Sequence, residues 1–391
     1  MAGSMGAMGA MGAMGAMGAM GAMGAMGAMG AMGATGAMGL TVSDVSDWNL
    51  TFMDALIKTR GGIAPLPEGA VLTPQFPLLD QAAQLAHWAP SVRMHLALFE
   101  LISSLNFEIE GEKASLYYLD VKRAAKTCTH SRIVSLLRPS KKVFEGQVKL
   151  VESWAELRED RSSEILTQLT PQFLFWSSVA HLNLHARPRT LELINLVLAF
   201  ASNIQMRFKH ALACPRPIDY SPSIMPVIPV PGHSSMPSGH ATEAFMVAHL
   251  LAKLMPHGGM HAPYLQRLAA RTSINRTVAG LHFPIDSHAG QILGQSLIEH
   301  FLCIATRAHR AEGVEEGGSL DFGEGWNKRF FDIAVAAGDT DVEKQGALDF
   351  RATTQPPEGR FVGDPSPGKP ARVLGWFWKQ AWREWHGRGG Q

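Results

Sequence analysis

The stretch "MPSGHATEAF" (residues 236–245) places a Ser-Gly-His triplet between a proline and a run with the pattern of a helix. Beyond the triplet, apolar residues recur on one helical face, at Phe245, Ala248, Leu251, Ala252 and Met255. Ser238 and Gly239 therefore begin a helix, whose N-terminus presents free N–H donors and a partial positive charge. Gly239 has no Cβ, so the backbone can approach a bound group closely. We predict an anion site here, with His240 beside it as a proton donor.

A second segment, "KHALACPRP" (residues 209–217), carries two cations. Lys209 lies at the end of a long apolar run, and Arg216 follows in a proline-rich connection. Two fixed cations can bind an anion, and the planar guanidinium of an arginine can donate two hydrogen bonds to a tetrahedral oxyanion. Residues 214–237 contain seven prolines in 24 positions, so we expect a stiff connection rather than a helix.

The third segment, "NRTVAGLHFPID" (residues 275–286), holds Arg276, His282 and Asp286. Pro284 prevents the preceding helix from continuing past His282. Asp286 then lies where it can cap the next helix and reach the imidazole of His282. A carboxylate bonded to one ring nitrogen fixes the tautomer and leaves the other nitrogen free to attack.

Each of these residues alone also fits a structural role, such as a surface ion pair or compensation of a helix dipole. Together and in this order, K-x6-R-P, P-S-G-H and R-x5-H-x3-D resemble the signature of the type 2 phosphatidic acid phosphatase and vanadium-dependent haloperoxidase superfamily. The resemblance covers roughly residues 190–305. Asn275 departs from it, since many phosphatase members carry Ser there, and we expect little loss because Arg276 is kept.

The resemblance implies an all-α fold, a helical bundle of the acid phosphatase/vanadium haloperoxidase type with its site at the helix ends. It implies that His282 attacks phosphorus to form a phosphohistidine, that Asp286 orients His282, and that His240 protonates the leaving alcohol. The groups implied to hold the phosphate oxygens are Lys209, Arg216, Ser238, the Gly239 N–H and Arg276. A phosphatase of this type requires no cofactor.

Three alternatives remain. In a vanadium-dependent haloperoxidase the same pocket holds vanadate as cofactor, His282 binds the vanadium, His240 is the acid–base partner in peroxide activation, and halide is oxidised by hydrogen peroxide. His233 resembles the histidine of bromoperoxidases in H-x-x-x-P-S-G-H, and is otherwise a loop residue beside the site. A non-catalytic anion-binding scaffold would not need the intact His240, His282 and Asp286. Zinc on His282, Asp286 and His288 lacks the tight ligand pairs of zinc sites.

The composition argues against some other classes of function. A net charge of +1 argues against a general nucleic-acid binder, and three scattered cysteines favour a reducing compartment. We find no secretory signal and no apolar run of about 20 residues, so we expect a cytoplasmic protein without a membrane span. Its expected partner is a small-molecule or lipid phosphate substrate, and a homo-oligomer is compatible with the sequence.

The chain divides into four predicted parts. Residues 1–40 form a disordered Gly-Ala-Met repeat, and residues 41–189 a helical region that packs on the catalytic core of residues 190–308. Residues 309–391 form a loop-rich extension that ends in a short Trp-rich helix, with Trp378, Trp382 and Trp385 on one face. We expect this helix to dock on its own protein. Thr190 is the expected N-cap of the first core helix.

Overall fold

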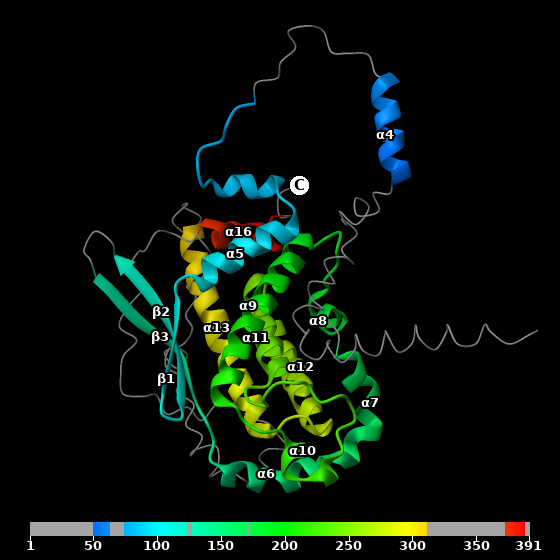
Figure 1. The fold of residues 1–391 in the computed structure, drawn as a ribbon, viewed down its shortest axis with the longest axis vertical. Helices are drawn as coiled ribbons and strands as arrows, with labels where there is room; N and C mark the ends of the chain where they lie inside the picture. Colours follow the sequence, from blue (N-terminus) through cyan, green and yellow to red (C-terminus); the bar gives the residue numbers. More distant parts are fainter. Residues whose placement is uncertain (1–49, 63–73, 123–126, 170–171, 311–371, 388–391) are drawn as a thin grey trace, which may run out of the picture.

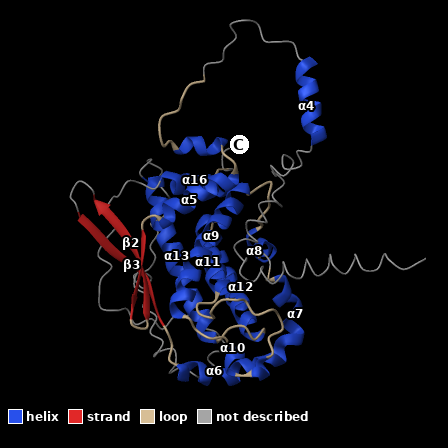
Figure 2. Ribbon diagram, in the orientation of Figure 1, coloured by secondary structure: helices blue, strands red, loops and turns tan. Residues whose placement is uncertain are grey.

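The structure, a computed structural model, describes residues 50–62, 74–122, 127–169, 172–310 and 372–387. Helices predominate in these ranges, and one small sheet lies at the side of the bundle (Figures 1 and 2). The predicted all-α class is confirmed. Among the helices described, none combines the length and apolar character that a membrane crossing requires. The predicted Gly-Ala-Met tail and most of the C-terminal extension lie outside the described residues.

The core is a bundle of four long helices, α9 (Pro188–Leu212), α11 (Gly239–Leu254), α12 (Gly258–Val278) and α13 (Pro284–Arg310). Helix α11 is central and contacts the other three (Figure 1). Two glycines let α13 approach the start of α11 at backbone distance. A Cβ on Gly290 would lie 2.5 Å from the Ser238 carbonyl oxygen, and one on Gly294 would lie 2.3 Å from that of Thr242. The first turn of α11 is therefore held against the first half of α13.

Most of the elements before the bundle form a peripheral layer that includes strands. This layer consists of η1 (Ala82–His87), α5 (Pro90–Ile102), β1 (Leu105–Glu110), β2 (Lys113–Lys122), β3 (Thr127–Leu137), α6 (Lys141–Ser153), η2 (Trp154–Leu157), α7 (Arg158–Thr167) and α8 (Phe173–Ala180). Helix α4 (Leu50–Gly62) stands apart from it (Figure 1). The strands pair antiparallel in the order β1-β2-β3. This sheet was not predicted. Ser115 and Ser135 are buried together with apolar neighbours and bond each other at 2.7 Å. Because polar residues are buried here as well, the sequence lacks the polar-apolar alternation that is typical of a half-buried strand.

The C-terminal helix α16 (Arg372–His386) docks on α5, α9 and α13, and its Trp378 is buried. Its Glu384 carboxylate accepts the N–H groups of Arg189 at 2.6 Å and Thr190 at 2.8 Å. The prediction that Thr190 is an N-cap was wrong, because α9 already begins at Pro188. A side chain almost 200 residues away in sequence satisfies the first-turn donors instead.

The proline-rich connection contains two short helical turns, α10 (Pro217–Tyr220) and η3 (Pro222–Ile224). Each begins with a proline at its first position, where the missing N–H has no helical partner to lose. The expectation of a connection without helix therefore fails for these seven residues and holds for the rest of residues 214–237. The connection links the end of α9 to the start of α11.

Candidate active site

The three sequence motifs meet at the end of the bundle where α10 packs against α6 (Figure 1). Each pair of motifs is joined by a hydrogen bond to a main-chain carbonyl. These bonds run from Lys209 Nζ to Pro237 at 2.6 Å, from Ser238 N to Asp286 at 2.8 Å, and from Arg216 Nη1 to Leu281 at 3.0 Å. Segments up to 77 residues apart in sequence, from Lys209 to Asp286, therefore form one cluster.

Lys209 occupies the last turn of α9 and is buried. Its ammonium donates to the carbonyls of Ser234 at 3.2 Å, Ser235 at 3.0 Å and Pro237 at 2.6 Å. Burial lowers the pKa of Lys209, and the nearby charge of Arg216 lowers it further. An ammonium has three protons, and these three carbonyls use all of them. Lys209 therefore fixes the loop before α11, and it acts on the proposed anion site through its charge and not through a hydrogen bond.

Arg216 precedes α10, and its guanidinium turns toward the motif cluster. Nε donates to the carbonyl of His233 at 3.1 Å, and Nη2 lies 3.2 Å from Nδ1 of the same histidine. The Arg216 N–H donates to Asp219 Oδ2 at 2.7 Å, which fixes the start of α10. Burial lowers the pKa of Arg216. His233 thus lies against Arg216, one of the predicted site residues.

His282 is buried in the turn before α13 and faces Asp286. Its Nδ1 lies 3.3 Å from Asp286 Oδ2 and 3.3 Å from the hydroxyl of Ser235, which itself donates to Oδ2. The Phe283 N–H also donates to Oδ2, at 2.9 Å, so Asp286 caps α13 as well. Burial raises the pKa of Asp286, whereas burial and the charges of Arg216 and Lys209 hold the pKa of His282 well below its usual value. A neutral His282 that donates from Nδ1 presents an unprotonated Nε2.

The spacing from Arg276 to His282 is set by a tight turn after α12. The Leu281 N–H donates to the carbonyl of Arg276 at 3.1 Å, and the Gly280 N–H to that of Thr277 at 2.9 Å. These two bonds form a Schellman motif, which requires a residue in the left-handed region after the helix. Gly280 has φ +80° and supplies it. The turn carries the chain from Arg276 directly to His282.

Arg276 and Ser238 leave donors without partners inside the protein. Both side chains are fully buried. Among the described residues, the Ser238 hydroxyl and the Nε and Nη1 of Arg276 have no hydrogen-bond partner. A buried unsatisfied donor costs about 1–3 kcal/mol, so these atoms favour a ligand that supplies acceptor oxygens. A tetrahedral oxyanion, phosphate or vanadate alike, fits this donor set.

Gly239 and His240 form the first turn of α11. A Cβ on Gly239 would lie 3.3 Å from the side-chain amide of Gln205, so even a methyl group would crowd this position. His240 is half-buried, and its Nε2 lies 3.1 Å from the carbonyl oxygen of Gln168. Burial and the charge of Arg276 lower the pKa of His240 to about 3. The imidazole is therefore neutral while no anion offsets the nearby cations.

Two residues of this cluster were not predicted from the sequence. Ser235, which bonds Asp286, stands in "SSMPSGH" directly before the motif and could have been singled out for that position. Gln168, which contacts both Arg276 and His240, lies 72 residues before His240 and carries no local signal. No group of three His, Cys, Asp or Glu side chains within the described ranges could hold a metal ion, and zinc on His282, Asp286 and His288 gains no support.

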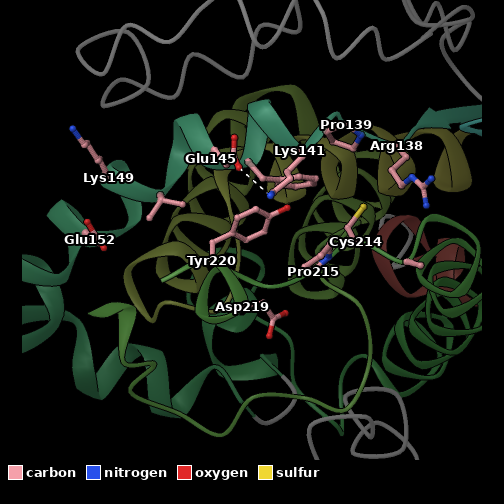
Figure 3. Close-up of a pocket in the computed structure, with 13 residues that line it drawn as sticks. Arg138, Pro139, Lys141, Glu145, Lys149, Glu152, Cys214, Pro215, Asp219 and Tyr220 are labelled. Atoms are coloured by element: carbon pink, nitrogen blue, oxygen red, sulfur yellow. Dashed lines mark ion pairs between the residues drawn. The ribbon is translucent and has the colours of Figure 1, made fainter. Parts of the chain in front are cut away.

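A separate pocket of about 780 Å³ lies between α6 and the turn that carries Arg216. Figure 3 shows Tyr220, Cys214 and Pro215 on the side of this turn, and Lys141 and Glu145, 3.4 Å apart, on the side of α6. None of the predicted site residues lines it. The pocket borders the site through aromatic contacts, since Tyr220 packs against Phe283 with ring centroids 5.5 Å apart.

Comparison with known proteins agrees with the motifs. No curated protein matches the chain in sequence. A family model does match, from the first turns of α9 to the end of α13, over the segment that supplies Lys209, Arg216, Arg276 and both histidines. The resemblance inferred from the three motifs is therefore confirmed over residues 191–310, which match the PAP2 superfamily.

Proposed function

We propose that the protein hydrolyses a phosphate monoester of a small molecule or lipid, with His282 forming a phosphohistidine. The match to the PAP2 superfamily supports a phosphatase-type activity at the level of the superfamily. The observation that carries the finer proposal is the set of buried, unpartnered donors on Ser238 and Arg276, joined to the imidazole of His282 through the Ser238–Asp286 bond.

The first step transfers the phosphoryl group to His282. Nε2 attacks phosphorus, the P–O bond to the alcohol breaks, and His240 gives its proton to the leaving oxygen. The Nδ1 proton stays on the Asp286 side, so the charge that develops on the imidazole faces a carboxylate. Arg276, Ser238 and the charges of Lys209 and Arg216 stabilise the phosphoryl oxygens, which is where most of the acceleration of such reactions arises.

The second step returns the enzyme to its starting state. Water attacks phosphorus, the P–N bond breaks, and His240 takes up the proton that the water loses. A bound phosphate dianion offsets the cations that depress the pKa of His240, so the imidazole can carry a proton in the complex although it is neutral without an anion. The products are the free alcohol, phosphate and neutral His282.

The same donors fit vanadate, which supplies peroxide activation when it is bound in a haloperoxidase. The test is a paired assay on one purified sample. We expect hydrolysis of p-nitrophenyl phosphate that vanadate inhibits and that His282→Ala abolishes. His210→Ala, which removes an exposed histidine at the end of α9, is the matched control and should keep full activity. Dye halogenation by peroxide only after vanadate loading, without ester hydrolysis, would establish the haloperoxidase alternative instead.

A further inference from the structure

We infer that Gln168, at the end of α7, is a positioning residue that orients Arg276 and His240 together. The inference rests on the proposed phosphatase function and adds a residue to it. Gln168 lies before the segment that matches the superfamily, in the peripheral layer of the fold. Its side chain is 1% exposed, so its hydrogen bonds are not shared with solvent.

The side-chain amide of Gln168 fixes one nitrogen of the Arg276 guanidinium by a hydrogen bond. Oε1 accepts from Arg276 Nη2 at 3.0 Å, and the carbonyl of Ile165 accepts from the same nitrogen at 3.1 Å. Oε1 also accepts from Asn275 Nδ2 at 3.0 Å. With both protons of Nη2 used, Nε and Nη1 are the donors left for an anion. Gln168 thereby fixes which part of the guanidinium meets the substrate.

The main-chain carbonyl of Gln168 contacts His240. It lies 3.1 Å from His240 Nε2, and because a carbonyl oxygen only accepts, this nitrogen carries a proton. The bond leaves Nδ1 as the ring nitrogen that can exchange a proton with the leaving oxygen. One residue thus sets both the orientation of a phosphate-binding cation and the tautomer of the proton donor.

The end of α7 is held in place by a ladder of bonds to α12 and the turn after it. Arg158 Nε donates to the Val278 carbonyl at 2.9 Å, Arg161 Nη1 to Asn275 Oδ1 at 3.0 Å, and Arg271 Nε to Glu164 Oε1 at 2.8 Å. Positions 158, 161, 164 and 168 follow helical spacing and share one face of α7. These bonds give Gln168 a fixed position. Asn275 takes part in them, because it accepts from Arg161 and donates to Gln168.

The neutral amide at position 168 matters for the charge of the site. Glu164, one turn earlier, pairs with Arg271 and accepts from Gln168 Nε2 at 3.3 Å, and it does not bond Arg276 directly. A carboxylate at position 168 would contact Arg276 directly and compensate that charge. The charged and titratable groups that act on His240 are Arg276, Lys209 and His233, with His282 nearby. A negative charge added beside Arg276 would raise the pKa of His240.

The test compares Gln168→Met and Gln168→Glu with matched changes at Gln172. Gln172 is also a buried glutamine facing α12, but it bonds Thr272 at 3.3 Å instead of Arg276. For Gln168→Met we expect kcat/KM for p-nitrophenyl phosphate to fall about 10- to 100-fold, as for a lost bond to a charged group, and vanadate inhibition to weaken. Gln172→Met should lower the melting temperature comparably and leave both constants near wild type.

The charge variants separate positioning from folding. Gln168→Glu keeps an acceptor for Arg276 but loses the amide that donates to Glu164 Oε1 at 3.3 Å, so we expect it to melt below the wild type, to bind vanadate more weakly and to shift the pH profile of kcat upward. Gln172→Glu should not shift that profile. Equal kinetics for the Gln168 and Gln172 variants would overturn the role of Gln168 while leaving the phosphatase intact. A wild-type enzyme without ester hydrolysis would refute the proposed function, and the inference with it.

Discussion

The N–H of Ser238 donates to the main-chain carbonyl of Asp286 at 2.8 Å, and this bond joins the starts of α11 and α13. It brings the residue with an unpartnered hydroxyl next to the residue that faces His282. The proposed anion donor Ser238 and the proposed nucleophile His282 lie 44 residues apart in the chain, and this backbone bond between their segments does not depend on either side chain. Side-chain substitutions can therefore test each function without removing the link between them.

Asp286→Asn should lower kcat about 10²- to 10⁴-fold, because an amide that donates to Nδ1 of His282 stabilises the wrong tautomer. Nδ1 of His282 and the Phe283 N–H both face Oδ2, so an amide that donates to Nδ1 from that position also gives up the bond from Phe283 N at the helix start. Burial raises the pKa of Asp286, so in the wild type we expect activity to fall on the acid side at a higher pH than an ordinary aspartate would give. Stopped-time hydrolysis assays from pH 4 to 9 measure both effects.

Asp219→Asn is the matched control for that change. Asp219 also accepts an N–H at the start of a helix, that of Arg216, but it does not bond a histidine within the described structure. We expect a much smaller loss of kcat and an unchanged acid limb. A loss as large as that of Asp286→Asn would mean that capping, and not control of the tautomer, explains both.

Ser238→Ala should weaken phosphate binding without weakening the unliganded fold. The Ser238 hydroxyl is buried and has no partner among the described residues, so its removal leaves nothing unsatisfied. A ligand at 100 times its Kd stabilises the native state by about 2.7 kcal/mol, and we expect the variant to lose much of this shift. Thermal melts with and without phosphate or vanadate provide the measurement.

Ser273→Ala should behave in the opposite way. Ser273 is equally buried on α12 but bonds the carbonyl of Ala269 at 2.8 Å. We expect a lower melting temperature without ligand and an unchanged shift on adding phosphate. If both serine variants kept the full shift, the Ser238 hydroxyl would have no part in binding the anion.

Glu243→Gln should flatten the pH dependence of stability. Burial raises the pKa of Glu243 to about 7, although Gln205 Nε2 donates to it at 3.1 Å. The folded protein therefore binds this proton more tightly than the unfolded chain does. The resulting stability is complete below about pH 4.5 and is lost as the pH rises through about 7. Urea midpoints at pH 5 and pH 8 should differ less in the variant than in the wild type.

Glu159→Gln removes an exposed carboxylate on α7 and is the control for this measurement. It should follow the wild type at both pH values. Parallel behaviour of the two variants would assign the pH dependence to other groups.

Gly280→Ala should disrupt the turn between Arg276 and His282. The residue has φ +80°, and a Cβ there would lie 2.9 Å from both Arg158 Nη2 and Ile224 Cγ2. We expect a loss of at least about 1–3 kcal/mol in the free energy of unfolding, together with reduced activity. Gly146→Ala, in the interior of α6 with nothing within 4 Å, should instead gain up to about 1 kcal/mol. Urea unfolding of the two variants shows whether the loss of stability is specific to position 280 or follows any change of glycine to alanine.

Glu384→Ala should destabilise the start of α9 from a distance. Its carboxylate accepts from two N–H groups and from the Thr190 hydroxyl, and the loss of such a cap costs about 0.5–2 kcal/mol. Arg383→Ala, at the exposed neighbouring position, should change the unfolding free energy little. Equal midpoints for both variants in urea would show that the cap contributes nothing.

Much of the site follows from local pattern. Lys209 falls at a helix end, Ser238 at a helix start, and Asp286 in the first turn after a proline, because residue spacing and prolines decide where helices begin and stop. The missed features have no local signature. The sheet was not predicted because its strands bury polar and apolar residues together. Gln168, Ser235 and Glu384 bond site or helix-start partners 47 to 195 residues away in sequence.

The sequence by itself determined on which helix ends the candidate site residues lie, since the starts and ends of helices depend on interactions within a few residues. Only the tertiary structure decided which donors stay free for an anion. Lys209 donates its protons to three carbonyls, whereas within the described residues Nε and Nη1 of Arg276 and the Ser238 hydroxyl have no acceptor. The physical reason is that hydrogen-bond satisfaction inside a protein is settled by whichever groups the packed helices bring within about 3 Å.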